Sequence, residues 1–115
     1  MKNKTKKKKI VLGLVEKIEI GGKKYKGRVD TGAKRSCVCK SIADELNFGK
    51  PIKKVKTVSA NGKSRRPVIK TKTILKGKKM KATFSIYNRE DMEYPVLIGR
   101  NILRRGFIIN PRKWK

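Results

Sequence analysis

Asp30-Thr31-Gly32 is the part of this sequence whose residue types are best suited to catalysis. The tripeptide follows the apolar Val29, as expected where a strand ends in a tight loop. Glycine lets the backbone approach another group without a Cβ clash, and the Thr31 hydroxyl is expected to hold the loop. Such a loop suits hydrolysis by two carboxylates that share one proton. The chain contains a single Asp-Thr-Gly, so the second carboxylate must come from another copy across a two-fold axis, which predicts a homodimer.

A second motif, Leu97-Ile98-Gly99-Arg100-Asn101, indicates what supports this loop. The apolar run before Gly99 predicts a short strand buried on both faces. Arg100 is expected at the start of a helix, where it forms an ion pair with residues near Asp30 or with the other subunit, or else remains a solvated surface charge. Alone, Asp-Thr-Gly also fits an ordinary turn. Together the motifs favour a site in which Asp30, Thr31 and Gly32 are catalytic and Leu97, Ile98, Gly99 and Arg100 support them.

A third segment, Ala60-Asn61-Gly62, is expected to form the turn of a hairpin, because Asn-Gly is a strong hairpin signal. The hairpin is either an ordinary surface turn or a flap that covers a substrate, and the sequence does not choose between them. As a flap, it predicts substrate-binding roles for Ala33, Ala60, Asn61 and Gly62.

Short strands must position these motifs. Apolar runs between Gly, Pro and Asn turn signals predict an all-β barrel or sandwich with one or two short helices. Ser41 is the expected N-cap of the first helix, which should end near Asn47 or Gly49. The predicted strands cover residues 10–20, 23–30, 55–59, 63–75, 80–87, 96–98 and 107–109, and the predicted helices cover residues 41–46 and 100–104.

The chain is strongly basic. Of its 115 residues, 34 are Lys or Arg and 8 are Asp or Glu, which gives a net charge of +26 with no His. This length predicts one domain over residues 10–115, preceded by a disordered lysine-rich tail over residues 1–9. The charge attracts polyanions, including nucleic acid, without specifying which one. The apolar run at residues 10–15 is too short for a signal-peptide core or a spanning helix, so we expect a cytoplasmic protein with no membrane partner.

Cys37 and Cys39 are the only cysteines and fall two residues apart on a probable strand. Same-strand neighbours rarely form a disulfide. A zinc site needs about four ligands, and without His the set would need carboxylates or a second subunit. We therefore expect buried, reduced thiols, and neither a metal nor another cofactor.

The motifs, in this order, resemble the retropepsin-like aspartic proteases, which carry Asp-Thr-Gly-Ala after a strand and a later apolar-apolar-Gly-Arg-Asn segment. Nearly all of the chain beyond the tail resembles more narrowly the retropepsin-like family labelled ATP-dependent zinc proteases. The segments that carry this narrower resemblance are Val29-Asp30-Thr31-Gly32-Ala33, Ser59-Ala60-Asn61-Gly62, Arg66-Pro67-Val68-Ile69, Asn88-Arg89-Glu90-Asp91-Met92, Leu97-Ile98-Gly99-Arg100 and Phe107-Ile108-Ile109-Asn110-Pro111.

The resemblance implies a retropepsin-like closed barrel, homodimeric, that hydrolyses polypeptides as an aspartic endopeptidase. The family often accompanies ATP-grasp ligases that add glutamates to a ribosomal protein, which implies an acidic or glutamylated substrate and a ligase as a partner. Two residues depart from its pattern: Arg35 replaces a small hydroxyl residue, and Asn110 replaces Asp. The alternative is a non-catalytic module whose basic surface binds ribosomal RNA or an acidic protein.

Overall fold

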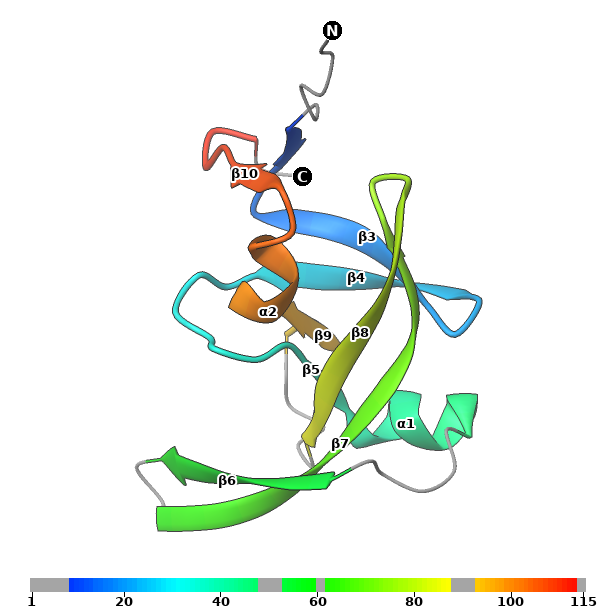
Figure 1. Cartoon of the computed structure of the whole chain (residues 1–115), viewed down its shortest axis with the longest axis vertical. Coiled ribbons are helices and arrows are strands. Elements are labelled where there is room, and N and C mark those ends of the chain that lie inside the picture. Colours follow the sequence, from blue (N-terminus) through cyan, green and yellow to red (C-terminus); the bar gives the residue numbers. More distant parts are fainter. Residues whose placement is uncertain (1–8, 48–52, 60–61, 88–92, 114–115) are drawn as a thin grey trace, which may run out of the picture.

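The computed structural model describes residues 9–47, 53–59, 62–87 and 93–113. Most of them form one twisted sheet with two short helices (Figure 1). The predicted tail lies almost entirely outside this part of the chain. The strands are β2 (Ile10–Leu12), β3 (Val15–Ile20), β4 (Lys23–Val29), β5 (Cys37–Cys39), β6 (Lys53–Ser59), β7 (Gly62–Leu75), β8 (Lys78–Tyr87), β9 (Val96–Ile98) and β10 (Phe107–Ile109), and the helices are α1 (Lys40–Leu46) and α2 (Arg100–Leu103).

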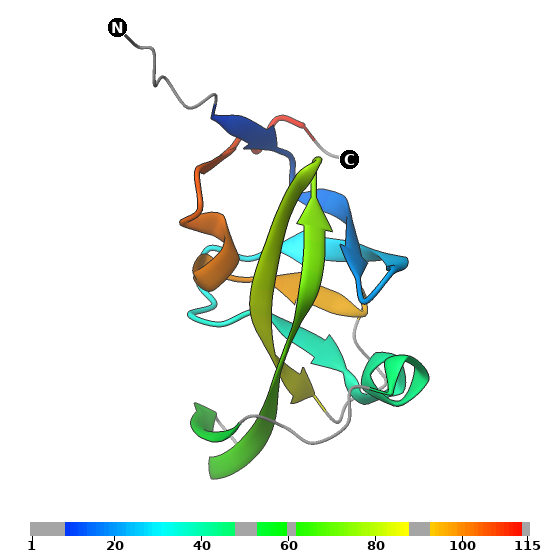
Figure 2. The ribbon, with the colours of Figure 1, turned by 45° about the vertical axis from the view of Figure 1, so that its right-hand side comes forward.

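The main sheet closes on itself. Its strand order is β3-β4-β9-β5-β8-β7-β6, and an additional antiparallel pairing joins β3 to β7. This pairing closes every strand of the sheet except β6 into a barrel, which confirms the predicted all-β barrel. β6 continues the sheet beyond β7 as one arm of a projecting hairpin (Figures 1 and 2).

The barrel interior is filled by alternate residues of its strands, because successive side chains of a strand point to opposite faces. Ile18, Leu75, Phe84 and Ile98 are each 0% exposed. Ile102 of α2 is equally buried and joins the same apolar cluster. This continuous core holds the ends of β4 and β9, from which the predicted site emerges, in fixed positions.

The β6–β7 hairpin has the register expected of a tight turn, with Ser59 paired with Gly62. Gly62 is the first residue of β7, while Ala60 and Asn61 lie outside the described residues. Pro67 pairs with Lys54 of β6, and the pairing of β7 with β8 begins only at Val68. Pro67 therefore lies on the two-stranded part of the hairpin, where its missing N–H costs no bond to a third strand.

The predicted strand over residues 10–20 is wrong in one respect, because it is broken into β2 and β3 at Gly13. The Gly13 N–H donates to the Glu16 carboxylate at 2.6 Å, and the Leu14 N–H donates to the Lys113 carbonyl at 2.9 Å. A Cβ at Gly13 would collide with that carbonyl. The C-terminal segment thus occupies the place where a continuous strand would need to run.

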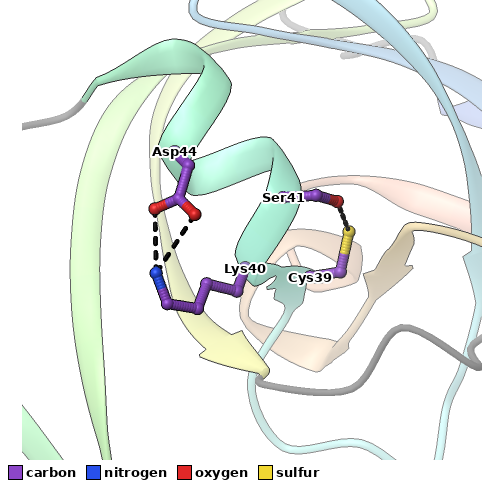
Figure 3. Close-up of polar contacts among 4 residues, drawn as sticks. All are labelled: Cys39, Lys40, Ser41 and Asp44. Atoms are coloured by element: carbon purple, nitrogen blue, oxygen red, sulfur yellow. Dashed lines mark hydrogen bonds and ion pairs between the residues drawn. The ribbon is translucent and has the colours of Figure 1, made fainter.

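The start of α1 also corrects the prediction. The N-cap is Cys39, without a side-chain cap, and Ser41 lies within the first turn. The Ser41 hydroxyl contacts Cys39 Sγ at 3.0 Å, while Lys40 pairs with Asp44 one turn later (Figure 3). Asn47 ends the helix in a left-handed conformation, as expected.

The terminal strands form a small sheet of their own. β10 pairs with β2 in parallel, with Ile108 opposite Val11. Phe107 is buried, whereas Val11 is 39% and Ile108 44% exposed, the largest exposures of bulky apolar side chains in the described part of the chain. Both described helices are too short or too polar to cross a membrane.

Candidate active site

Asp30 lies at the point where β4 leaves the barrel. Its N–H donates to the Ile98 carbonyl of the parallel strand β9 at 2.9 Å. The Gly32 N–H donates to Asp30 Oδ1 at 3.0 Å, and a Cβ at Gly32 would stand 3.3 Å from the same oxygen. Asp30 is half-buried, while Thr31 and Gly32 are exposed. The loop therefore fixes one oxygen of the Asp30 carboxylate and leaves Asp30 partly exposed to solvent.

Gly99 packs closely against the backbone of the Asp30 loop and fixes its position. Because β4 and β9 are parallel and Val29 is in register with Ile98, Asp30 and Gly99 emerge from the same end of the sheet. A Cβ at Gly99 would lie 2.7 Å from the Arg35 carbonyl carbon and 2.9 Å from the Ala33 oxygen. That Ala33 oxygen accepts a hydrogen bond from the Arg100 N–H at 2.8 Å. The two sequence motifs are thus in direct backbone contact, as predicted.

A buried hydroxyl and an amide complete this support, and neither was predicted. Ser36 is fully buried; its hydroxyl accepts from the Gly99 N–H at 2.8 Å and donates to Asn101 Oδ1 at 2.7 Å. The Asn101 amide donates to the Thr83 carbonyl of β8 at 3.0 Å. The network ties the Asp30 loop, α2 and β8 together. The feature of the sequence that could have indicated this network is Asn101, which directly follows Gly99-Arg100.

The cations near Asp30 are placed differently from expectation. Arg35 Nη1 donates to Thr83 Oγ1 at 3.3 Å, so this guanidinium is anchored on β8. Arg100 forms no ion pair with any residue in the described part of the chain, and its buried Nε has no hydrogen-bond partner there. The predicted pairing of Arg100 with neighbours of Asp30 is therefore wrong, because the charged residues that flank Asp30 are the cations Arg28, Lys34 and Arg35. Pairing with another subunit stays a prediction.

A cavity of about 160 Å³ lies at the start of β3 and the end of β4, and Val29, which precedes Asp30 in the sequence, is among its lining residues. Its apolar lining comes from residues before β3 and at the end of β4, and Arg28 and Glu93 add opposite charges at the rim. These two charged groups are 4.0 Å apart and well exposed. The lining residues are Leu14, Val15, Arg28, Val29, Glu93 and Tyr94. The cavity can accommodate an apolar stem with a charged end.

The two cysteines are free and buried, as expected. Burial raises the pKa of the Cys37 thiol to about 11, and the Arg66 charge opposes this shift. The Arg66 guanidinium stacks on the Tyr87 ring, 3.5 Å from its centre, and so joins β7 to the end of β8 where the hairpin leaves the barrel. Such a thiol is a poor nucleophile near neutral pH.

The predicted site residues fall into two groups. The structure brings together Asp30, Thr31, Gly32, Ala33, Leu97, Ile98, Gly99 and Arg100. Gly62 belongs to the projecting hairpin, and the substrate-binding roles of the hairpin residues stay a prediction. Among the described residues, no three His, Cys, Asp or Glu side chains come together as a metal-ligand set.

Three solved structures are similar to this chain in fold. Lpg0085 from Legionella pneumophila, of unknown function, has a TM-score of 0.64 at 18% identity over 91% of this chain and 95% of that one. The simian foamy virus (mac) protease has a TM-score of 0.62 at 20% identity, covering 78% and 91%. The EIAV protease in complex with the inhibitor HBY-793 has a TM-score of 0.63 at 16% identity, covering 90% and 92%. No curated protein matches the chain.

The sequence itself matches one protein family, whose description is "RimB-like: Retropepsin-like aspartic endopeptidase RimB". The match covers residues 43–114, more than half of the chain. It includes the Gly99 motif and Asn101 but begins after the Asp30 loop, so the assignment of Asp30 rests on the geometry and the fold. The chain belongs to the RimB-like family of retropepsin-like aspartic endopeptidases.

Proposed function

We propose that the chain is an aspartic endopeptidase that acts as a homodimer, with Asp30 of each subunit forming one catalytic pair. The observation that carries the proposal is the geometry of the Asp30 loop. The Gly32 N–H holds one Asp30 carboxylate oxygen, and contacts with Gly99 and Ser36 fix the loop in place. A half-buried carboxylate on a rigid support is what a shared-proton site requires.

Hydrolysis follows from the proximity of two such carboxylates. Because two like charges sharing a site do not both ionise easily, the pair holds a single proton. The ionised Asp30 takes a proton from a water molecule, whose oxygen attacks the peptide carbonyl, while the protonated Asp30 donates its proton to the carbonyl oxygen. The C–N bond of the resulting diol then breaks as the Asp30 that took the water proton gives it to the leaving amine and the other Asp30 takes a hydroxyl proton, which restores the shared-proton pair. Cleavage should therefore follow a bell-shaped pH profile.

The small β2–β10 sheet supports the dimer. Val11 and Ile108 face each other across its parallel register and are both partly exposed. Apolar side chains that are unusually exposed in one copy of a chain are candidates for burial in an interface.

We further propose that the substrate is an acidic or glutamylated polypeptide. The cavity at the end of β4 carries Arg28 at its rim, held by Glu93 at 4.0 Å in an exposed pair. Exposed pairs of this kind are weak, so a substrate carboxylate can replace Glu93 as the partner of Arg28. An ATP-grasp ligase that adds glutamates would supply such a substrate.

The test is cleavage of a Glu-rich peptide by wild type and by Asp30→Asn. We expect the substitution to abolish cleavage and leave the fold unchanged. Asp44→Asn is the matched control, because Asp44 is an exposed carboxylate whose partner is Lys40 on α1, and it should keep full activity. If Asp30→Asn cleaves as wild type does, the Asp30 mechanism is wrong. If neither protein cleaves the peptide, the alternative, a non-catalytic module that binds RNA or an acidic protein, takes its place. Stoichiometric zinc in active protein would also contradict the proposal.

A further inference from the structure

The outer side of the barrel carries a set of lysines that the proposed peptidase site does not use. They lie at alternate positions of β3, β4, β7 and β8 and are all exposed. The set, called here the lysine face, consists of Lys17, Lys24, Lys26, Lys70, Lys72, Lys79 and Lys81. Figure 2 shows the β7–β8 ribbon as the front wall of the barrel, with neither helix in front of it.

The strand register places these lysines next to one another. Lys72 is directly opposite Lys81, and Lys17 is directly opposite Lys26. Glu19 pairs with Ile74 across β3 and β7, so the lysines of β3 and β7 lie on the same side of one continuous sheet. Directly opposed side chains in a sheet have Cβ atoms only about 5 Å apart, and like charges there destabilise the pairing.

Neutralising partners for this face are scarce within the chain. Glu19 is the single carboxylate among the outward positions of residues 15–28 and 70–83. None of the seven lysines forms an ion pair with another described residue. The described carboxylates that do form pairs contact cations elsewhere. A ligand with many regularly spaced negative charges would relieve this repulsion.

The composition of the face distinguishes between classes of polyanion. Protein interfaces are enriched in aromatic residues and Arg and depleted of Lys, which is the opposite of what is seen here. The outward positions carry no aromatic side chain, so the face lacks the stacking platform by which proteins bind unpaired bases. The bases of a duplex are already stacked, so a duplex needs no such platform. Its phosphates can bind lysines, which act as point charges.

We propose that the lysine face binds the phosphate backbone of double-helical nucleic acid without reading its sequence. This binding is separate from catalysis, so the Asp30→Asn protein should bind as wild type does. Contact by all seven lysines would make the logarithm of the binding constant fall with that of the salt concentration with a slope of about −6.

The test is fluorescence anisotropy of labelled RNA and DNA duplexes of one sequence, titrated with full-length protein at several salt concentrations. Lys72→Gln/Lys81→Gln should reduce the salt slope by about 2, and its stability should be unchanged or higher because an opposed like-charge pair is removed. The control is Lys9→Gln/Arg112→Gln, which removes the same charge from exposed residues outside the face and should have a much smaller effect.

Four outcomes would overturn the proposal. The first is no binding of either duplex by wild type at low salt. The second is an equal loss of slope in the two double variants, which would mean that net charge alone drives binding. The third is tighter binding of single-stranded RNA or anionic vesicles than of the duplexes. The fourth is binding of the RNA duplex alone, or of the DNA duplex alone, because the proposal requires binding to the phosphate backbone that both duplexes share.

Discussion

At the scale of single residues, Ser36 is the group on which the Asp30 loop depends most. Its hydroxyl is fully buried, accepts from Gly99 and donates to Asn101. These partners are far apart in the sequence: Ser36 and Asn101 are separated by 65 positions. Sequence motifs identified Gly99 but missed Ser36, because a serine in a loop has no distinctive signal until the fold shows what it contacts.

Ser36→Ala should lower the free energy of unfolding by about 1–3 kcal/mol, since it leaves the buried Gly99 N–H without its acceptor. Ser41→Ala is the control, because that hydroxyl is exposed and contacts Cys39 alone in the described part of the chain. Urea denaturation of both variants measures the difference. Equal stabilities of the two variants would show that the Ser36 network does not hold the loop.

Arg28 sets the preference for an acidic substrate if the cavity at the end of β4 is used as proposed. Arg28→Gln should raise KM for a Glu-rich peptide roughly tenfold, because a charge-assisted hydrogen bond to the substrate is lost, and should leave kcat nearly unchanged. Lys79→Gln, which removes an exposed cation of β8 that does not line this cavity, is the control. The proposed role of Arg28 is wrong if both variants keep the wild-type KM.

Cys37 makes stability depend on pH at the alkaline end. Burial raises the pKa of its thiol from 9.0 to about 11, so the unfolded chain loses this proton at lower pH than the folded chain does. The stabilisation is complete below pH 9 and is lost as the pH rises through about 11, by up to about 1.4 kcal/mol per pH unit.

Denaturation of wild type and Cys37→Ala under reducing conditions tests this dependence. The variant should lose less stability than wild type between pH 9 and pH 11, whatever its stability at pH 7. Parallel losses in the two proteins would show that Cys37 does not titrate as described.

At the scale of elements, the terminal strands are where the dimer should form. Ile108→Lys places a charge on the exposed side of β10, where the native residue is 44% exposed in the single chain. The variant should remain folded by circular dichroism but sediment as a monomer and lose peptidase activity. A fully dimeric, active Ile108→Lys protein would move the interface elsewhere.

Most elements follow from local sequence patterns, with two exceptions. β9 and β10 lie where their apolar runs predict, and Asn47 ends α1 as expected. The break at Gly13 depends on contact with Lys113, which no local pattern could reveal. The start of α1 differs because Ser41 bonds to Cys39 instead of capping the helix.

At the scale of the whole molecule, the family and the fold agree with the Asp30-Thr31-Gly32 motif. The barrel brings the two motifs together through the parallel pairing of β4 and β9. This pairing places one Asp30 at the end of the sheet in each chain, and the chemistry needs two. The central claim is therefore that the catalytic unit contains Asp30 from both of two copies.

Mixing wild type with Asp30→Asn at a constant total concentration, after subunit exchange, tests this claim most directly. Because a mixed dimer has one carboxylate and is inactive, activity should fall with the square of the wild-type fraction, to about one quarter in an equal mixture. A linear fall, to about one half in the same mixture, would mean that each subunit acts with its own Asp30 and would contradict the shared site.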